Sequence, residues 1–220
     1  MVPIQENITK INCRTANRKP ADIKFLVFHY VGAVSSAYNN TVFFKDLYRE
    51  ASAHYFVDEK SIWQCVLEKD IAWHCGTSGA YMHPSCRNDN SIAIELCVKK
   101  DALGKWFFEP QTVQNTLDLT AVLVEKYGIG AEGFLRHYDV TGKICPEPWV
   151  RDVPAWESFK QKVKKPVISP NVPAWQIDGF EALIKAKIIQ SPDYWQNRLD
   201  QPVTAGELFA ILAGILAKEK

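Results

Sequence analysis

The run Phe25-Leu26-Val27-Phe28-His29-Tyr30 decides the fold class of this chain, because it is short and almost wholly apolar. Such a run is typical of a central β-strand whose two faces are both covered by other elements. His29 then lies near the carboxyl end of that strand, where α/β folds place ligands and catalytic groups. The run therefore predicts an α/β protein with a candidate functional histidine at position 29. A core histidine bonded to the backbone is the alternative interpretation.

A second strong strand is predicted over residues 91–98, where isoleucine, leucine and valine side chains alternate onto one face. Glu95 shares the other face with the small residues Ala93 and Cys97. A carboxylate on a central strand is costly to bury without a partner. We therefore expect Glu95 to face a cleft, a cation or both.

Between residues 53 and about 160, the remaining sequence patterns predict helices and one hairpin. Strands at 53–57 and 61–66 flank a turn at 58–60, so they are expected to pair as a hairpin. Helical spacing extends over 110–127 and ends at Gly128, and a further helix is expected around Trp156.

An earlier helix is expected to begin at a cap formed by Asn39 or Asn40 and to continue to about residue 50. Its predicted buried side consists of Val42, Phe43, Leu47 and Tyr48. Residues 1–20 are polar and are interpreted as an irregular edge.

The stretch 135–146, Leu-Arg-His-Tyr-Asp-Val-Thr-Gly-Lys-Ile-Cys-Pro, carries the strongest chemical signal. His137 and Cys145 offer an imidazole nitrogen and a thiolate, which suit a borderline-soft divalent ion such as zinc. Taken alone, such a pair is more often a packed histidine and a buried thiol. His29 supplies a third candidate ligand, and three protein ligands with water in the fourth position make an open catalytic zinc site.

Two further residues complete a candidate mechanism. Zinc would acidify its water and polarise a carbonyl. Glu95 suits the general base that takes the water's proton, and Lys143 would direct a positive charge at the developing oxyanion. Together these parts indicate an amide hydrolase.

Five ordered motifs within residues 20–165 then carry a family resemblance. They are Val-Phe-His-Tyr (27–30), Ser-Ala-His-Tyr-Phe-Val-Asp (52–58), Ile-Ala-Trp-His-Cys-Gly (71–76), Asn-Ser-Ile-Ala-Ile-Glu-Leu (90–96) and the segment 136–146. The chain resembles the zinc-dependent N-acetylmuramoyl-L-alanine amidases of the type-2 family. That family occurs in phage endolysins and bacterial autolysins and is related to peptidoglycan recognition proteins.

The resemblance implies a mixed central β-sheet flanked by helices. It also implies that the residues matching His29, His137 and Cys145 hold zinc, and that the bond between N-acetylmuramic acid and L-alanine of peptidoglycan is cleaved. Some relatives place a catalytic tyrosine where this chain has Ala53; others use a glutamate at the place of Glu95, and the base is assigned to Glu95 accordingly.

Several aromatic and imidazole side chains near these motifs have open roles. By strand alternation Tyr55 shares the face of Ala53, so a minor role for it stays possible. His74 resembles a groove-lining position, and His74 and Trp73 are the candidate substrate contacts, with a structural role for His74 as the alternative. His54 is expected in the core or behind the ligands, and His83 is expected to have no role.

The sequence predicts three parts: a catalytic domain at 1–163, a linker at 164–173 with three prolines, and a small helical domain at 174–220. The last part is faintly similar to a single S-layer-homology-like repeat through the string 204–212, where Thr204 and Glu207 could form a capping box. Two roles are considered for this small helical domain: wall targeting and self-association into a homo-oligomer.

Composition excludes some classes of function. A net charge of +1 argues against a general nucleic-acid binder, and no apolar run is long enough to insert into a membrane. Six cysteines without a CxxC pair make a disulfide framework improbable. With no signal peptide expected, the protein would be made in the bacterial host cytoplasm and act at the cell wall after release.

These features favour a phage or prophage endolysin. Two alternatives are a binding module that recognises muramyl peptides without cutting them, and an amidase that acts on anhydro-muropeptides during cytoplasmic recycling.

Overall fold

The computed structural model describes residues 2–164, 173–186, 188, 189, 195, 199, 203–206, 208, 212 and 215. Contacts divide the chain into two compact units, residues 1–164 and 165–220. Most of the expected linker and of the segment 204–218, including the Glu207 end of its capping box, lies outside the described residues. The division into catalytic domain, linker and tail, and self-association of the tail, therefore stay predictions.

The first unit is built on a six-stranded sheet with the order β1-β4-β3-β5-β2-β8. The strands are β1 (Ile4–Glu6), β2 (Phe25–Tyr30), β3 (Tyr55–Val57), β4 (Ile62–Gln64), β5 (Ser91–Leu96) and β8 (Phe134–Arg136). Strand β2 pairs in parallel with β5 and β8, whereas β3 and β4 form the expected antiparallel hairpin. The sheet is mixed, which confirms the predicted fold class.

Strand β2 lies inside the sheet because both of its faces are apolar. Leu26, Val27 and Phe28 are fully buried. Leu26 and Phe28 belong to the large core cluster, and Val27 belongs to a smaller cluster on the other face. This alternation explains why the run contains no polar residue before His29.

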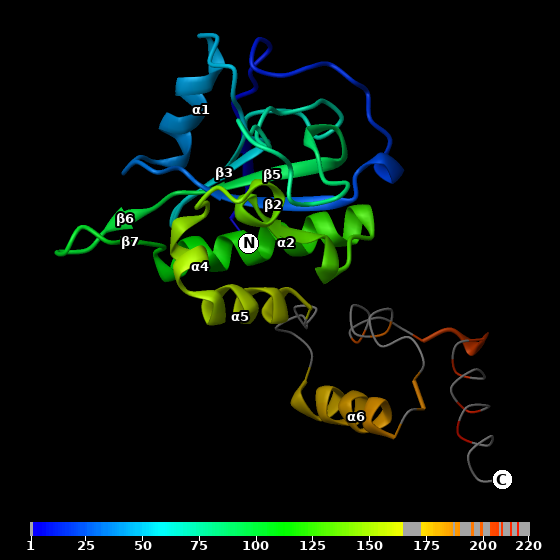
Figure 1. The fold of residues 1–220 in the computed structure, drawn as a ribbon. Coiled ribbons are helices and arrows are strands. Elements are labelled where there is room, and N and C mark those ends of the chain that lie inside the picture. Colours follow the sequence, from blue (N-terminus) through cyan, green and yellow to red (C-terminus); the bar gives the residue numbers. More distant parts are fainter. Residues whose placement is uncertain are drawn as a thin grey trace. The chain divides into compact units, whose positions relative to one another are not determined.

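Helices cover both faces of the sheet (Figure 1). The helices are α1 (Ala37–Lys45), α2 (Pro110–Tyr127), α3 (His137–Thr141), α4 (Glu147–Arg151) and α5 (Val153–Lys164), with α6 (Ala174–Lys185) in the second unit. Short 3-10 turns span Pro20–Asp22, Asn88–Asn90 and Ala131–Gly133, and β6 (Lys99–Lys100) pairs with β7 (Trp106–Phe107).

Helix α2 has the predicted bounds, and its ends show why. Pro110 occupies the first turn, where its missing N–H is not needed. Gly128 follows the helix in a left-handed conformation with φ +63° and donates its N–H to the Val124 carbonyl. Helices α2 and α5 pack on the same face of the sheet (Figure 1), which buries Trp156 and Phe159 against Phe28.

Helix α1 contradicts the predicted orientation. Its cap is Ser36, and its buried residues are Ala37, Asn40 and Thr41. The residues predicted as buried are 48% (Val42), 51% (Phe43), 61% (Leu47) and 64% (Tyr48) exposed.

The polar N-terminal segment explains this difference. Asn7 donates to Thr41 Oγ1 at 2.9 Å, and Asn12 donates to the carbonyls of Phe44 and Leu47, each at 2.6 Å. Helix α1 therefore attaches through hydrogen bonds to these amide side chains as well as through the apolar contacts of Ala37 and Phe44, and the predicted apolar stripe stays exposed. The segment also supplies β1, which pairs in parallel with β4, so it is more ordered than the predicted irregular edge.

Two further expectations concerned disulfide bonds and membrane insertion. All six cysteines lie among the described residues and are free thiols. No helix in the described part of the chain is long and apolar enough to cross a membrane.

Candidate metal centre and cleft

Three side chains predicted as ligands converge at the carboxyl edge of the sheet. His29 is the penultimate residue of strand β2. His137 begins α3 directly after β8, and β8 runs parallel to β2. Cys145 follows the Gly142 turn, where φ is +80°. One ligand atom from each of the three lies within 4.8 Å of the others, and all three residues are buried. Parallel neighbouring strands explain why residues so distant in sequence meet here.

Hydrogen bonds leave one nitrogen of each histidine turned toward this meeting point. His137 Nε2 lies 3.3 Å from the Gly76 carbonyl oxygen, which can only accept, so Nε2 carries the hydrogen. His137 Nδ1 is then a buried acceptor, and among the described residues it has no partner. His29 Nε2 is 3.1 Å from His74 Nδ1, while His29 Nδ1 is 3.7 Å from Cys145 Sγ.

Burial keeps both imidazoles neutral. It lowers the pKa of His29 well below its ordinary value, and the nearby His137 and His74 act in the same direction. Burial likewise lowers the pKa of His137 to about 4, and it raises the pKa of the Cys145 thiol to about 12. Two neutral imidazole nitrogens and one sulfur are donors suited to zinc. A buried nitrogen without a protein partner is suited to bind a metal ion.

Glu95 lies beside this group on strand β5, in register with His29 of strand β2. Its Oε2 is covered and finds no hydrogen-bond partner in the described part of the chain. Burial raises the pKa of Glu95 to about 7, and the positive charge of Lys143 acts against that rise. A carboxyl with such a pKa can hold or release a proton near neutrality.

A cavity of about 280 Å³ joins these groups. Its lining includes all five residues predicted as ligands or catalytic groups, together with the predicted contacts Trp73 and His74. His74 is only 7% exposed and both its nitrogens have partners, His29 Nε2 and Ser91 Oγ, each at 3.1 Å. Substrate contact by Trp73 and His74 stays a prediction.

The other two histidines have structural partners. His54 is fully buried; its Nδ1 accepts the Ala93 N–H at 3.0 Å and its Nε2 lies 3.2 Å from the Asp70 carbonyl oxygen. His83 Nδ1 accepts the Cys86 N–H at 2.9 Å within its own loop. His54 belongs to the core, as expected.

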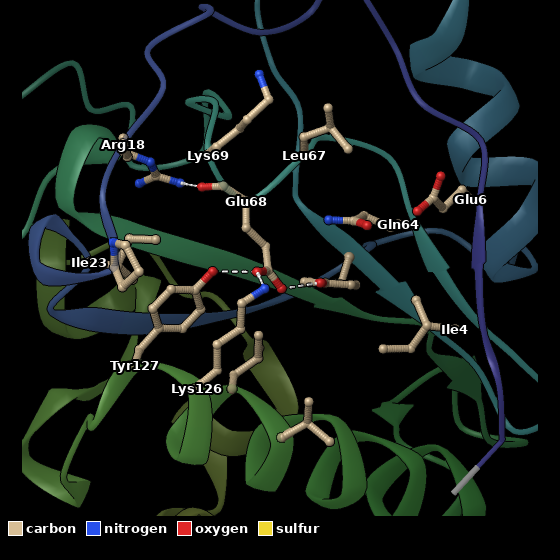
Figure 2. Close-up of a pocket in the computed structure, with 14 residues that line it drawn as sticks. Ile4, Glu6, Arg18, Ile23, Gln64, Leu67, Glu68, Lys69, Lys126 and Tyr127 are labelled. Atoms are coloured by element: carbon tan, nitrogen blue, oxygen red, sulfur yellow. Dashed lines mark hydrogen bonds and ion pairs between the residues drawn. The ribbon is translucent and has the colours of Figure 1, made fainter.

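Sequence reasoning missed a second and larger cavity, which Figure 2 shows. It has a volume of about 580 Å³, and its lining includes Glu68. Both oxygens of Glu68 are used, by hydroxyl groups of Tyr55 and Tyr127 and by the ammonium of Lys126. Tyr55 therefore turns away from the cleft, which argues against the minor catalytic role left open for it. These residues form no motif, because they come from separate elements.

Comparison with known proteins identifies relatives for the first unit. The N-acetylmuramoyl-L-alanine amidase family matches residues 19–148. N-acetylmuramoyl-L-alanine amidase CwlL of Bacillus licheniformis is 37% identical over 174 residues, which is 74% of this chain and 47% of that protein. A probable N-acetylmuramoyl-L-alanine amidase of the same species is 32% identical and is covered to 48%. The chain thus spans about half the length of the curated relatives it matches.

Solved structures show the same fold. The PlyG catalytic domain aligns with a TM-score of 0.62 at 24% identity, covering 78% of this chain and 99% of that domain. PlyL aligns with a TM-score of 0.60 at 23% identity, covering 74% and 97%. At these identities the likeness supports the fold of the first unit.

Proposed function

Because the chain belongs to the N-acetylmuramoyl-L-alanine amidase family, we propose that it hydrolyses the amide bond between N-acetylmuramic acid and L-alanine in peptidoglycan. The observation that carries this proposal is the meeting of His29, His137 and Cys145 at a cleft that also contains Glu95. A binding module would need the cleft, but it would have no use for a carboxyl with a covered, unpartnered oxygen and a raised pKa.

The proposed ion is zinc, held by Nδ1 of His29, Nδ1 of His137 and Sγ of Cys145. When bound, zinc would polarise the scissile carbonyl and acidify a water molecule. The orphaned Nδ1 of His137 and the mixed nitrogen and sulfur donor set support this assignment.

Glu95 is proposed to move the proton. Its carboxylate would take a proton from the attacking water, as the C–O bond forms, and pass it to the departing nitrogen of L-alanine. The products are the lactyl carboxylate of the muramic acid and a free L-alanine amino group. The unpartnered Oε2 and a pKa of about 7 support this role, because the group can exchange a proton without a large barrier.

Lys143 is proposed to stabilise the negative charge that develops on the carbonyl oxygen. It lines the cleft together with Glu95, and the two are electrostatically coupled. A positive charge that reaches the reacting carbonyl would stabilise the negative charge developing on its oxygen.

The proposed setting is the bacterial cell wall, which the protein reaches as an endolysin after release from the cell that makes it. The amidase relatives support this substrate. Intact wall rather than free anhydro-muropeptide is proposed as the substrate, and digestion of purified sacculi against soluble muropeptide separates the two.

The test is lysis of purified cell walls. We expect loss of turbidity with the appearance of L-alanine amino termini, inhibition by a chelator and recovery on addition of zinc. Binding to walls without new L-alanine termini would instead support the recognition module.

A further inference from the structure

We propose that His74 is a positioning residue that fixes the tautomer of His29, through a hydrogen-bonded relay ending at the backbone carbonyl of Arg87. The proposal rests on the metal centre of the proposed function. In it, His29 must carry its hydrogen on Nε2, so that the lone pair of Nδ1 faces Cys145 Sγ, which is 3.7 Å away.

The relay has a direction because one of its ends can only accept. The Arg87 carbonyl oxygen lies 2.6 Å from Ser91 Oγ, and two oxygen atoms at that distance need a hydrogen between them. The Ser91 hydroxyl therefore donates to Arg87, and its own oxygen is left to accept. His74 Nε2, at 3.1 Å, must supply that hydrogen.

The same logic continues to His29. A neutral His74 with hydrogen on Nε2 has a lone pair on Nδ1. That lone pair faces His29 Nε2 at 3.1 Å, so His29 donates and retains a free lone pair on Nδ1. His29 is 2% exposed, His74 7% and Ser91 fully buried, so water competes little with the relay.

Cys75 offers competing contacts, because its Sγ lies 3.3 Å from His74 Nδ1 and, at longer range, 4.0 Å from His74 Nε2 and 3.9 Å from Ser91 Oγ. Nδ1 has a single lone pair, and a thiol is a weaker donor than an imidazole N–H. The reverse arrangement, with His74 Nδ1 donating to His29, would place a hydrogen on His29 Nδ1 and remove its lone pair from the site.

The tautomer of His137 is fixed in the same way, but by a single hydrogen bond to a backbone carbonyl. Its Nε2 faces the Gly76 carbonyl oxygen directly, at 3.3 Å. The two carbonyls that orient the imidazoles, those of Gly76 and Arg87, stand at either end of the loop 76–87. The loop therefore orients both ligands.

The experiment compares wild type with His74→Asn and His74→Leu. Asparagine can place an acceptor oxygen where Nδ1 lies, whereas leucine cannot accept. We expect His74→Leu to weaken zinc binding by about 10–100-fold, measured by competition with a chelator of known affinity, and His74→Asn to recover most of that loss. Gln114→Leu, on the exposed face of helix α2 and away from this loop, serves as the control and should leave zinc affinity unchanged.

A second measurement does not depend on metal. Nitrogen-15 NMR of the metal-free wild type should show His29 as the Nε2–H tautomer, and Ser91→Ala, a smaller change, should mix the tautomers. Wild-type zinc affinity in both His74 variants, or an Nδ1–H tautomer in wild type, would overturn the relay. Failure of wild type itself to bind zinc would instead refute the proposed metal centre, and the NMR result would still decide the relay.

Discussion

Two covered carboxylates in two cavities of this molecule have opposite properties. Glu68 lines the larger cavity with a side chain only 10% exposed, yet its pKa is lowered. Burial alone would raise that pKa, but hydrogen bonds from Lys126, Tyr127 and Tyr55 outweigh it. Glu95 lines the smaller cleft with an unpartnered Oε2, and its pKa is raised to about 7.

The difference teaches that partners, rather than burial or cavity size, decide which carboxylate is reactive. A carboxylate that accepts several hydrogen bonds is held in its charged form, and one without them is held near its point of protonation. The larger cavity (Figure 2) is therefore interpreted as a structural junction between α2 and the segment after β4, whereas the smaller one contains the proposed catalytic groups.

Removing a proposed ligand should give the largest effect. Cys145→Ser should lower bound zinc from about one ion per chain to near zero and abolish wall lysis, because the sulfur is one of three protein donors. Metal analysis after dialysis measures this. Cys65→Ser makes the same change at a fully buried thiol away from the site and should keep its zinc. Equal zinc content in the two variants would remove Cys145 from the ligand set.

The second prediction sets the two carboxylates against each other in turnover. Glu95→Gln should keep zinc and lower kcat by about 10²–10⁴-fold, because the amide cannot take the proton. Glu68→Gln should change kcat little, since its partners lie outside the cleft. Release of L-alanine amino termini from purified walls is the assay. Comparable losses of kcat in both variants would contradict the different roles of the two carboxylates.

Stability should show the reverse pattern. Glu68→Gln should lower the free energy of unfolding by about 1–3 kcal/mol, since it removes charge from buried hydrogen bonds. Glu95→Gln should leave that free energy unchanged or higher above pH 7, because it removes a charge that burial disfavours. Urea denaturation of both variants measures this, and a large loss in Glu95→Gln alone would contradict it.

The smallest effect concerns pH. The pKa of Glu68 is lower in the folded chain than in the unfolded one, so its stabilisation is present above the unfolded pKa of about 4.3. It is lost as the pH falls through the folded pKa. The stability gap between wild type and Glu68→Gln should therefore shrink below about pH 4, and a gap that stays constant from pH 7 to 3 would argue against the lowered pKa.

Much of the fold could be predicted because it depends on local apolar pattern. Strand β2 and helix α2 have the predicted bounds, since one is a buried apolar run and the other has proline and glycine at its ends. Helix α1 could not be oriented in this way. Its inward side contains Asn40 and Thr41, whose partners come from residues more than thirty positions away.

The sequence was enough to predict which residues form the candidate site, but not which hydrogen bonds orient them. His29, His137 and Cys145 stand at strand ends and turns that a sequence reveals. The direction of the relay depends on Ser91 Oγ meeting the carbonyl of Arg87, and the Glu68 cluster depends on three elements meeting. No spacing rule encodes either arrangement.

X-ray absorption at the zinc edge of the purified protein tests the central claim most directly. The account predicts one sulfur at about 2.3 Å with the remaining ligands nitrogen or oxygen at about 2.0–2.1 Å, and loss of the sulfur shell in Cys145→Ser. A shell without sulfur in wild type, or no bound zinc at all, would contradict it.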